Sequence, residues 1–295
     1  MIVIDDINEI KNYKIVQSAV TIGKFDGVHR GHMLLLNRIL ELKNEGYTAV
    51  VCMINQGKPG VLSFREKAEY LESLGVDYLI NFRFTDEFAK QTPEQFISSF
   101  LMDKLDAAKV VVGNDFHFGY KRSGDTTTLK SFEKKYGYTC DFYEKLKEGS
   151  TVISSTEIRQ SLGFGDMASA KVMLGRPYSI CGTVVHGKHL GSTIGFPTIN
   201  ILPEEDKLVP KYGVYTSKVL VGSEEYRGIT NIGEKPTVGG FPVSAETYIF
   251  DFDRDIYGEQ VTVIPERFIR EERRFASIDE LKAQLDRDIE DARNI

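Results

Sequence analysis

Short apolar runs alternate with amphipathic segments from residue 15 to about residue 160. Apolar runs of strand length predict buried strands over Val20–Ile22, Ala49–Ile54, Tyr78–Phe82 and Lys109–Gly113. Apolar positions at helical spacing predict helices over Met33–Lys43, Phe64–Leu74 and Pro93–Leu105, the last capped by Thr92. This alternation is typical of a parallel sheet with helices on both faces.

A glycine-rich turn, Thr21–His32, joins the first predicted strand to the first predicted helix. Gly27 and Gly31 let a ligand approach the backbone, and the N-terminus of the following helix favours an anion. His29 and His32 can point together into that pocket and stabilise charge that develops on a phosphate. The alternative is that both histidines only make local hydrogen bonds at the start of the helix.

A second polar segment follows the predicted strand Lys109–Gly113. Asn114 and Asp115 come directly after this strand, and aromatic residues follow them. Because ligands of parallel sheets bind beyond the carboxyl ends of the strands, we expect this segment at the same rim as the glycine-rich turn. The alternative is a turn in which Asn114 and Asp115 only satisfy backbone donors.

The pattern changes after Gly175, where short alternating runs replace the longer helices. Turn residues separate these runs at fairly regular intervals, which predicts an antiparallel barrel. A last amphipathic segment, Ile278–Ile289, predicts a terminal helix packed on the barrel. We therefore expect two domains, 1–175 and 176–295. The predicted barrel strands are Tyr178–Val185, Gly213–Val221, Tyr226–Ile232, Ala245–Phe252 and Gln260–Phe268.

The segment Val184–Asn200 is rich in glycine for a strand region. Its glycines expose backbone donors to a polyphosphate, and Thr198 and Asn200 offer oxygen ligands to a hard cation. Further along, the carboxylate of Glu246 can accept a proton from a hydroxyl that attacks a γ-phosphate. The alternatives are a tight turn for the first segment and a solvated strand residue for Glu246.

Composition limits the classes of function. A chain of 295 residues with 41% hydrophobic and 27% charged residues is typical of a globular protein with two domains. A net charge of −6 disfavours nucleic-acid binding, and no apolar run is long enough to cross a bilayer. The three scattered cysteines and the absence of a secretion signal predict a cytoplasmic protein with reduced thiols, and no obligate protein partner is evident.

Three segments carry a resemblance over the first half. Gly-Lys-Phe-Asp-Gly-Val-His-Arg-Gly-His at 23–32 resembles the first signature of the nucleotidyltransferases that adenylylate FMN. Gly113–Gly119 and Ile153–Arg159 are similar to the second and third signatures, in the same order. The resemblance implies a Rossmann-like fold in which His29, His32 and Arg159 are catalytic. It also implies that ATP or flavin binds at Gly23, Lys24, Phe25, Asp26, Gly27, Asn114, Asp115, Ser154, Ser155 and Thr156.

The second half resembles the riboflavin kinase domain, through Gly-Phe-Pro-Thr-Ile-Asn at 195–200 and the later strand that contains Glu246. The resemblance implies that Thr198 and Asn200 bind Mg²⁺ and ATP phosphate and that Glu246 is the base. It implies ATP or flavin binding at Gly187, Gly191, Gly195, Pro197, Asn231 and Arg270.

Together these segments resemble the bifunctional riboflavin kinase/FAD synthetase family, which implies that riboflavin, FMN, FAD and ATP are ligands. Two features of the first half depart from the family pattern. The segment Ile54–Gly60 lacks the histidine that many members carry there, and Lys24 stands where asparagine is frequent. The alternatives are therefore a riboflavin kinase whose nucleotidyltransferase domain is catalytically weak or regulatory, and a flavin-binding regulator without catalysis.

Overall fold

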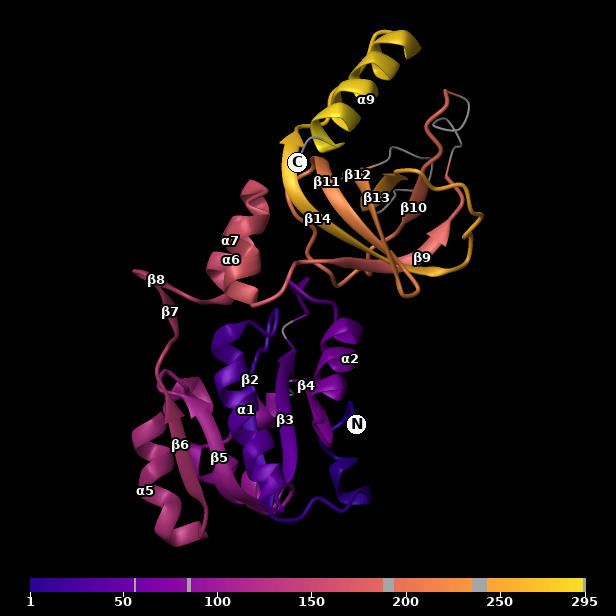
Figure 1. The fold of residues 1–295 in the computed structure, drawn as a ribbon. Helices are drawn as coiled ribbons and strands as arrows, with labels where there is room; N and C mark the ends of the chain where they lie inside the picture. The colour runs from indigo at the N-terminus through magenta and orange to yellow at the C-terminus, as the bar shows by residue number, and fades with distance from the viewer. Residues whose placement is uncertain (56, 84–85, 188–193, 235–242, 294–295) are drawn as a thin grey trace. The chain divides into compact units, whose positions relative to one another are not determined.

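The structure, a computed structural model, describes residues 1–55, 57–83, 86–187, 194–234 and 243–293 (Figure 1). It divides into two compact units, Met1–Ser154 and Ser155–Ile295, and each is described by itself. The boundary between these units falls before the two short helices that precede Gly175. The domain boundary expected at residue 175 therefore remains a prediction. In the described part of the chain, no helix is both long enough and apolar enough to cross a membrane.

The first unit contains a six-stranded sheet in the order β1-β4-β3-β2-β5-β6, and every neighbouring pair is parallel. This confirms the predicted parallel sheet and adds an edge strand on each side. The strands are β1 (Ile2–Ile4), β2 (Ser18–Gly23), β3 (Thr48–Asn55), β4 (Tyr78–Arg83), β5 (Ala107–Gly113) and β6 (Thr139–Tyr143). A two-stranded hairpin follows, made of β7 (Lys147–Glu148) and β8 (Thr151–Val152).

The helices of this unit are α1 (Arg30–Asn44), α2 (Phe64–Leu74), α3 (Asp86–Ala89), α4 (Pro93–Gln95) and α5 (Thr126–Tyr136). Three irregular turns accompany them: the 3₁₀ turns η1 (Ile10–Asn12) and η3 (Tyr120–Arg122), and the π-helix η2 (Phe96–Met102).

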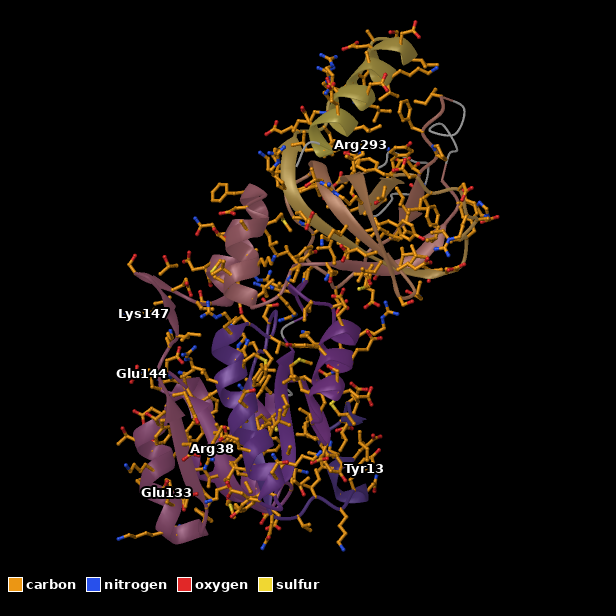
Figure 2. The ribbon with its side chains drawn as sticks, viewed as in Figure 1. Tyr13, Arg38, Glu133, Glu144, Lys147 and Arg293 are labelled. Atoms are coloured by element: carbon orange, nitrogen blue, oxygen red, sulfur yellow. The ribbon has the colours of Figure 1, made fainter. Side chains whose placement is uncertain are left out.

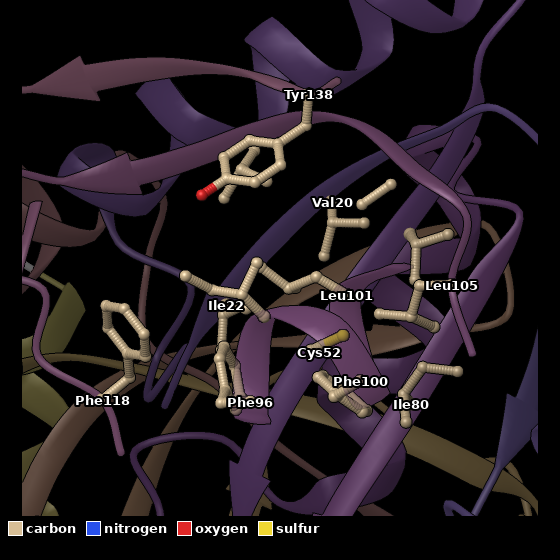
Figure 3. Close-up of a cluster of buried hydrophobic side chains, with 14 of the residues drawn as sticks. Val20, Ile22, Cys52, Ile80, Phe96, Phe100, Leu101, Leu105, Phe118 and Tyr138 are labelled. Atoms are coloured by element: carbon tan, nitrogen blue, oxygen red, sulfur yellow. The ribbon is translucent and has the colours of Figure 1, made fainter. Parts of the chain in front are cut away.

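Both faces of the sheet are buried, which explains why its strands are apolar at nearly every position. On β2, the alternating residues Ala19 and Val20 belong to different cores. One core packs α1 and α2 against the sheet. The other core contains Phe96 and Phe100 of η2 and Tyr138 before β6, and Figure 3 shows part of it.

The predicted helix Pro93–Leu105 differs from the structure. Thr92 caps α4 through a reciprocal bond with Gln95, as predicted, but only Pro93–Gln95 is α-helical before the chain widens into η2. The buried residues Phe96, Ile97, Phe100 and Leu101 form two adjacent pairs that are four residues apart. This spacing suits the wider π turn, so η2 turns all four side chains into the core.

The second unit contains a closed barrel in the order β10-β13-β12-β11-β14-β9, and every neighbouring pair of strands is antiparallel, as predicted. The structure adds β10, which the sequence pattern did not predict. β13 ends three residues before the predicted end at Phe252, because the chain turns at Asp251 with φ 54°. The strands are β9 (Ile180–Val185), β10 (Ile199–Ile201), β11 (Gly213–Val221), β12 (Glu224–Glu234), β13 (Val243–Ile249) and β14 (Gln260–Arg270).

Two helices, α6 (Ser155–Phe164) and α7 (Met167–Leu174), belong to this unit; α7 packs on β14 of the barrel, and α6 packs on α7. The turn between them approaches β14 closely, since a Cβ on Gly165 would lie 3.2 Å from the ring of Phe268. The amide of Lys211 also donates to the carbonyl of Leu162 at 2.8 Å.

The predicted terminal helix is present as α9 (Ile278–Arg293) and extends four residues beyond the predicted end. Its apolar face packs on Ile229 and Phe250 of the barrel. A buried ion pair reinforces this contact: Nη2 of Arg270 lies 2.7 Å from Oδ2 of Asp288, which is 1% exposed.

Candidate active sites

His29 and His32 cap the N-terminus of α1 reciprocally. The amide of His32 donates to Nδ1 of His29, and the amide of His29 donates to Nδ1 of His32, each at 3.3 Å. The two rings stack with their centroids 3.7 Å apart. A Cβ on Gly31 would lie 3.1 Å from the His29 ring, so glycine at this position leaves room for the stack.

The local hydrogen bonds named as the alternative are therefore present, and they constrain the chemistry of the two rings. A ring nitrogen that accepts a hydrogen bond carries no proton, so each neutral ring holds its proton on Nε2. An Nε2–H group can donate to a phosphate oxygen. Capping and ligand binding thus use different nitrogens of the same ring.

The turn before these histidines is tightly constrained. Phe25, Gly27 and Val28 all have positive φ, at 46°, 78° and 41°. Phe25 is fully buried with its ring centroid 5.0 Å from that of His32, and the buried Asp26 accepts from the amide of Val61 at 2.7 Å. Of the residues expected to bind ligand, Phe25 and Asp26 support the turn, whereas Lys24 is exposed and Gly23 half-buried.

Asn114 and Asp115 are exposed at the carboxyl end of β5, on the predicted rim. Asn114 Nδ2 donates to the carboxylate of Glu144, which is labelled in Figure 2, and Asp115 lies 2.8 Å from the ammonium of Lys145. Their partners come from the segment after β6. The second signature therefore ties two neighbouring strand ends together.

The same signature lines an aromatic cavity of about 250 Å³ at the carboxyl ends of β2 and β3. The residues that line it include five phenylalanines and four polar residues. Two of these, Lys121 and Arg122, have positive φ of 51° and 60°, a strained backbone of the kind found at ligand sites. The lining includes Phe88, Phe96, Phe100, Phe116 and Phe118, with Gln91, His117, Lys121 and Arg122.

The sequence pattern did not predict this cavity. Its only local signal was the aromatic stretch after Asn114 and Asp115. Phe88, Phe96 and Phe100 come from a segment that reads as ordinary helix core, and only the fold brings them to the rim.

The third signature begins at the division between the units. Ser154 is the last residue of the first unit, and Ser155, Thr156 and Arg159 lie on α6 in the second. The expected approach of Arg159 to His29 and His32 therefore stays a prediction.

In the barrel, three polar residues form one row across neighbouring strands. Glu246 on β13 lies directly opposite Asn200 on β10 and directly opposite Asn231 on β12. Directly opposed residues point to the same face of a sheet, so the three side chains gather there. Thr198 joins the row, since its hydroxyl donates to Oε1 of Glu246 at 2.9 Å.

Glycines make room for this row. A Cβ on Gly187 would overlap the amide of Asn200, which is 5% exposed, and a Cβ on Gly233 would overlap the carboxylate of Glu272. Gly187 was expected to bind phosphate through its backbone; the structure adds that its missing side chain lets Asn200 fit. Gly195 has φ 92°, which glycine adopts without strain, and the expected site residue Gly191 lies outside the described residues.

Two of the expected ligand-binding residues have partners within the second unit. Asn231 Nδ2 donates to Oε1 of Glu272 at 2.8 Å, a contact that the sequence pattern did not predict. Arg270 donates from Nε to both carboxylate oxygens of Asp288 at 3.1 Å and holds α9. The structure thus gives Arg270 an anchoring role.

A second cavity, of about 320 Å³, adjoins Pro197 and Thr198. Its wall includes Phe252, Arg254 and Tyr257 from the loop after β13. The ring of Tyr257 stacks on that of His186, with centroids 3.9 Å apart. This cavity therefore combines flat apolar surface with the oxygen atom of Thr198.

The chain's thiols do not supply a nucleophile within the first unit. Burial raises the pKa of Cys52, and burial together with Glu133 raises the pKa of Cys140 to about 12. Both groups therefore stay protonated at neutral pH. Among the residues that the structure describes, no group of three or more His, Cys, Asp or Glu side chains is arranged to hold a metal ion.

Comparison with known proteins identifies the family. The chain is 41% identical over 281 residues to the bifunctional riboflavin kinase/FMN adenylyltransferase of Escherichia coli (strain K12), covering 91% of this chain and 90% of that protein. The chain belongs to this family. The corresponding protein of Bacillus subtilis (strain 168) is 35% identical, covering 94% of this chain and 92% of the relative.

Family models divide the chain in the same way. The FAD synthetase model matches residues 12–157, and the riboflavin kinase model matches residues 174–295. A crystal structure of a macrolide-efflux protein from Streptococcus pneumoniae has a TM-score of 0.86 and 30% identity, covering 100% of both chains. The resemblance drawn from the signatures is thus confirmed over most of the chain.

Proposed function

We propose that the chain converts riboflavin to FAD in two steps. The ATP γ-phosphate passes to the 5′-hydroxyl of riboflavin, giving FMN and ADP. AMP from a second ATP then passes to the FMN phosphate, giving FAD and pyrophosphate. One observation carries this proposal: two different catalytic family models, for FAD synthetase and for riboflavin kinase, match separate segments of the chain.

Glu246 is the base of the kinase step. The attacking hydroxyl of riboflavin loses its proton to the carboxylate as its oxygen bonds to the γ-phosphorus and ADP leaves. The hydrogen bond from Thr198 to Oε1 orients the carboxylate for this role. The cavity beside Pro197 and Thr198 takes the nucleotide, with its rings against Phe252 and Tyr257.

Thr198 and Asn200 are the protein ligands of Mg²⁺ in this site. A hydroxyl and an amide oxygen suit a hard cation, and Mg²⁺ commonly takes few protein ligands because water and phosphate complete its coordination. The ion would neutralise charge on the ATP phosphates. The amide of Asn200 is well placed to hold it, because packing against the backbone of Gly187 restricts its movement.

The adenylylation step uses His29 and His32. The FMN phosphate attacks the α-phosphorus of ATP, and charge grows on the departing pyrophosphate. Two Nε2–H donors at the N-terminus of α1 stabilise that charge. The family signature assigns a catalytic role in the same step to Arg159, whose guanidinium is a planar cation suited to phosphate oxygens. The isoalloxazine ring of FMN occupies the phenylalanine cavity, whose rim carries Lys121 and Arg122 near the flavin's phosphate-bearing chain.

The ligands are therefore riboflavin, FMN, FAD and ATP. The net charge of −6 supports the expectation that nucleic acid is not among them. Scattered cysteines, odd in number, support a cytoplasmic location.

Incubation with riboflavin and ATP tests this function, with the flavins separated by chromatography over time. We expect FMN to appear first and FAD to follow when Mg²⁺ is present, and neither product to form after chelation. FMN without FAD would favour a kinase with an inactive first unit. Binding of flavin without either product would favour the regulator.

A further inference from the structure

The wall of the phenylalanine cavity contains one shielded polar atom that has no partner. Gln91 lines the cavity, and its Oε1 is buried without a hydrogen-bond partner among the described residues. A shielded acceptor that makes no hydrogen bond costs free energy, and native proteins rarely leave one without a reason. In a cavity that takes a ligand, the missing donor can come from that ligand.

The neighbouring hydroxyl fixes which atom of the Gln91 amide is left unpaired. The hydroxyl of Ser99 donates its proton to the backbone carbonyl of Gln95 at 2.6 Å. In its hydrogen bond with Gln91, the Ser99 oxygen can therefore only accept. Gln91 Nε2 lies 3.4 Å from this oxygen and supplies the proton. The amide nitrogen therefore faces Ser99, and the unpaired atom is the carbonyl oxygen.

The other polar side chains that line the cavity do not offer a shielded acceptor. Lys121 and Arg122 only donate hydrogen bonds. His117 is exposed, and its Nδ1 lies 2.8 Å from the carbonyl of Asp115. The phenylalanines cover the faces of a flat ring but offer nothing to its polar edge.

We propose that Gln91 is a specificity-determining residue for the flavin, and that its carboxamide oxygen accepts a hydrogen bond from the N3–H of the isoalloxazine ring. The proposal rests on the proposed function, in which this cavity takes FMN. Oxidised isoalloxazine has a single ring N–H, at N3 between two carbonyl groups. Because Gln91 lines the cavity, its oxygen can accept from that edge while its Nε2 stays bonded to Ser99.

FMN methylated at N3 is the probe, because it keeps the ring and the phosphate but cannot donate. The parent protein should form the FAD product from FMN with a kcat/KM at least about tenfold above that for 3-methyl-FMN, as a site built around an N–H rejects an analogue that lacks it. Gln91→Leu, which keeps the size but removes the acceptor, should reduce this ratio to within about threefold. Gln91→Glu keeps an acceptor and should retain most of the parent ratio.

A purely structural loss in Gln91→Leu lowers the rates for both substrates and leaves their ratio unchanged, which overturns the proposal. Equal use of the two flavins by the parent overturns it as well. Fluorescence titration with FMN and 3-methyl-FMN gives the same ratio from affinities. If the parent binds both flavins but forms no FAD, the adenylylation function fails, while the ratio of affinities still decides the role of Gln91.

Discussion

At the scale of single residues, the kinase site depends on two glycines, whose lack of a side chain leaves room for polar neighbours. Gly187 has no side chain where Asn200 packs, and Gly233 has none where Glu272 lies. Each gap lets a polar side chain reach the row formed by Asn200, Glu246 and Asn231. The positions of these oxygen atoms are therefore set by close contact with backbone.

Replacing Gly187 with alanine tests this account. The added methyl group overlaps the Asn200 amide, so Asn200 has to move away from the metal position. A displacement of about 1 Å in such a site costs on the order of 10²-fold in rate, and we expect FMN formation to fall by that amount. FAD formation from supplied FMN should not change.

Gly163→Ala is the matched control, because a Cβ at Gly163 meets nothing within 4 Å. It should leave FMN formation unchanged. Parent-like FMN formation by Gly187→Ala across a Mg²⁺ titration would contradict the role given to the packing of Asn200.

The sequence predicted Thr198, Asn200 and Glu246 because each occupies a position in a short local pattern. It did not predict Glu272, whose partner Asn231 lies 41 residues away, or Gln91, which only the fold brings to the wall of the phenylalanine cavity. Nor did it predict that Arg270 pairs with Asp288. Motif positions are local, whereas partners of this kind depend on tertiary packing.

At the scale of secondary-structure elements, α1 combines a cap with a site. Its two histidines satisfy backbone amides through Nδ1 and keep the proton on Nε2. Loss of the cap and loss of the donor are therefore separable effects, since other side chains can cap a helix.

His29→Asn and His29→Ala separate them. Asparagine is a good N-cap, so His29→Asn should keep the parent Tm, whereas His29→Ala should lose about 1 kcal/mol of stability. Both variants lack the imidazole donor, and both should lose FAD formation by on the order of 10²–10³-fold. If His29→Asn retains the parent rate of FAD formation, the histidine acts only as a cap.

The terminal helix α9 offers a second test at this scale. Asp288→Ala leaves the guanidinium of Arg270, whose side chain is only 20% exposed, without its carboxylate. Breaking a buried pair in this way costs about 3–5 kcal/mol, and we expect a loss near the lower end in chemical denaturation because Arg270 is partly exposed.

Asp291→Ala, at an exposed position of the same helix, should change stability by less than about 0.5 kcal/mol. Arg270→Met combined with Asp288→Leu should recover most of the loss, because no buried charge then remains unpaired. Equal effects of Asp288→Ala and Asp291→Ala would show that the pair does not anchor α9.

Most strands and helices were predictable because their apolar periodicity is strong. β10 was not, because it has three residues and follows a glycine-rich segment without periodicity. The π-helix η2 was expected as α-helix, since the two periods differ little over seven residues. Asn200 lies opposite Glu246 because β10 pairs with β13. Since β10 was not predicted, the sequence could not predict this pairing either.

At the scale of the whole molecule, the chain joins two catalytic units of different architecture. The change from strand–helix alternation to short alternating runs predicted this organisation. The compact division at Ser154–Ser155 places α6 and α7 with the barrel, although Ser155, Thr156 and Arg159 belong to a nucleotidyltransferase signature. Sequence periodicity did not indicate this assignment, because it identifies helices but not the surface on which they pack.

The central claim is that FMN and FAD formation occur at separate sites with separate chemistry. Glu246→Gln tests it most directly, because an amide keeps the shape of the carboxylate but cannot take the hydroxyl proton. We predict that this variant forms no FMN from riboflavin while it converts supplied FMN to FAD at the parent rate. FMN formation at the parent rate, or an equal loss of both activities in a folded variant, would contradict the account.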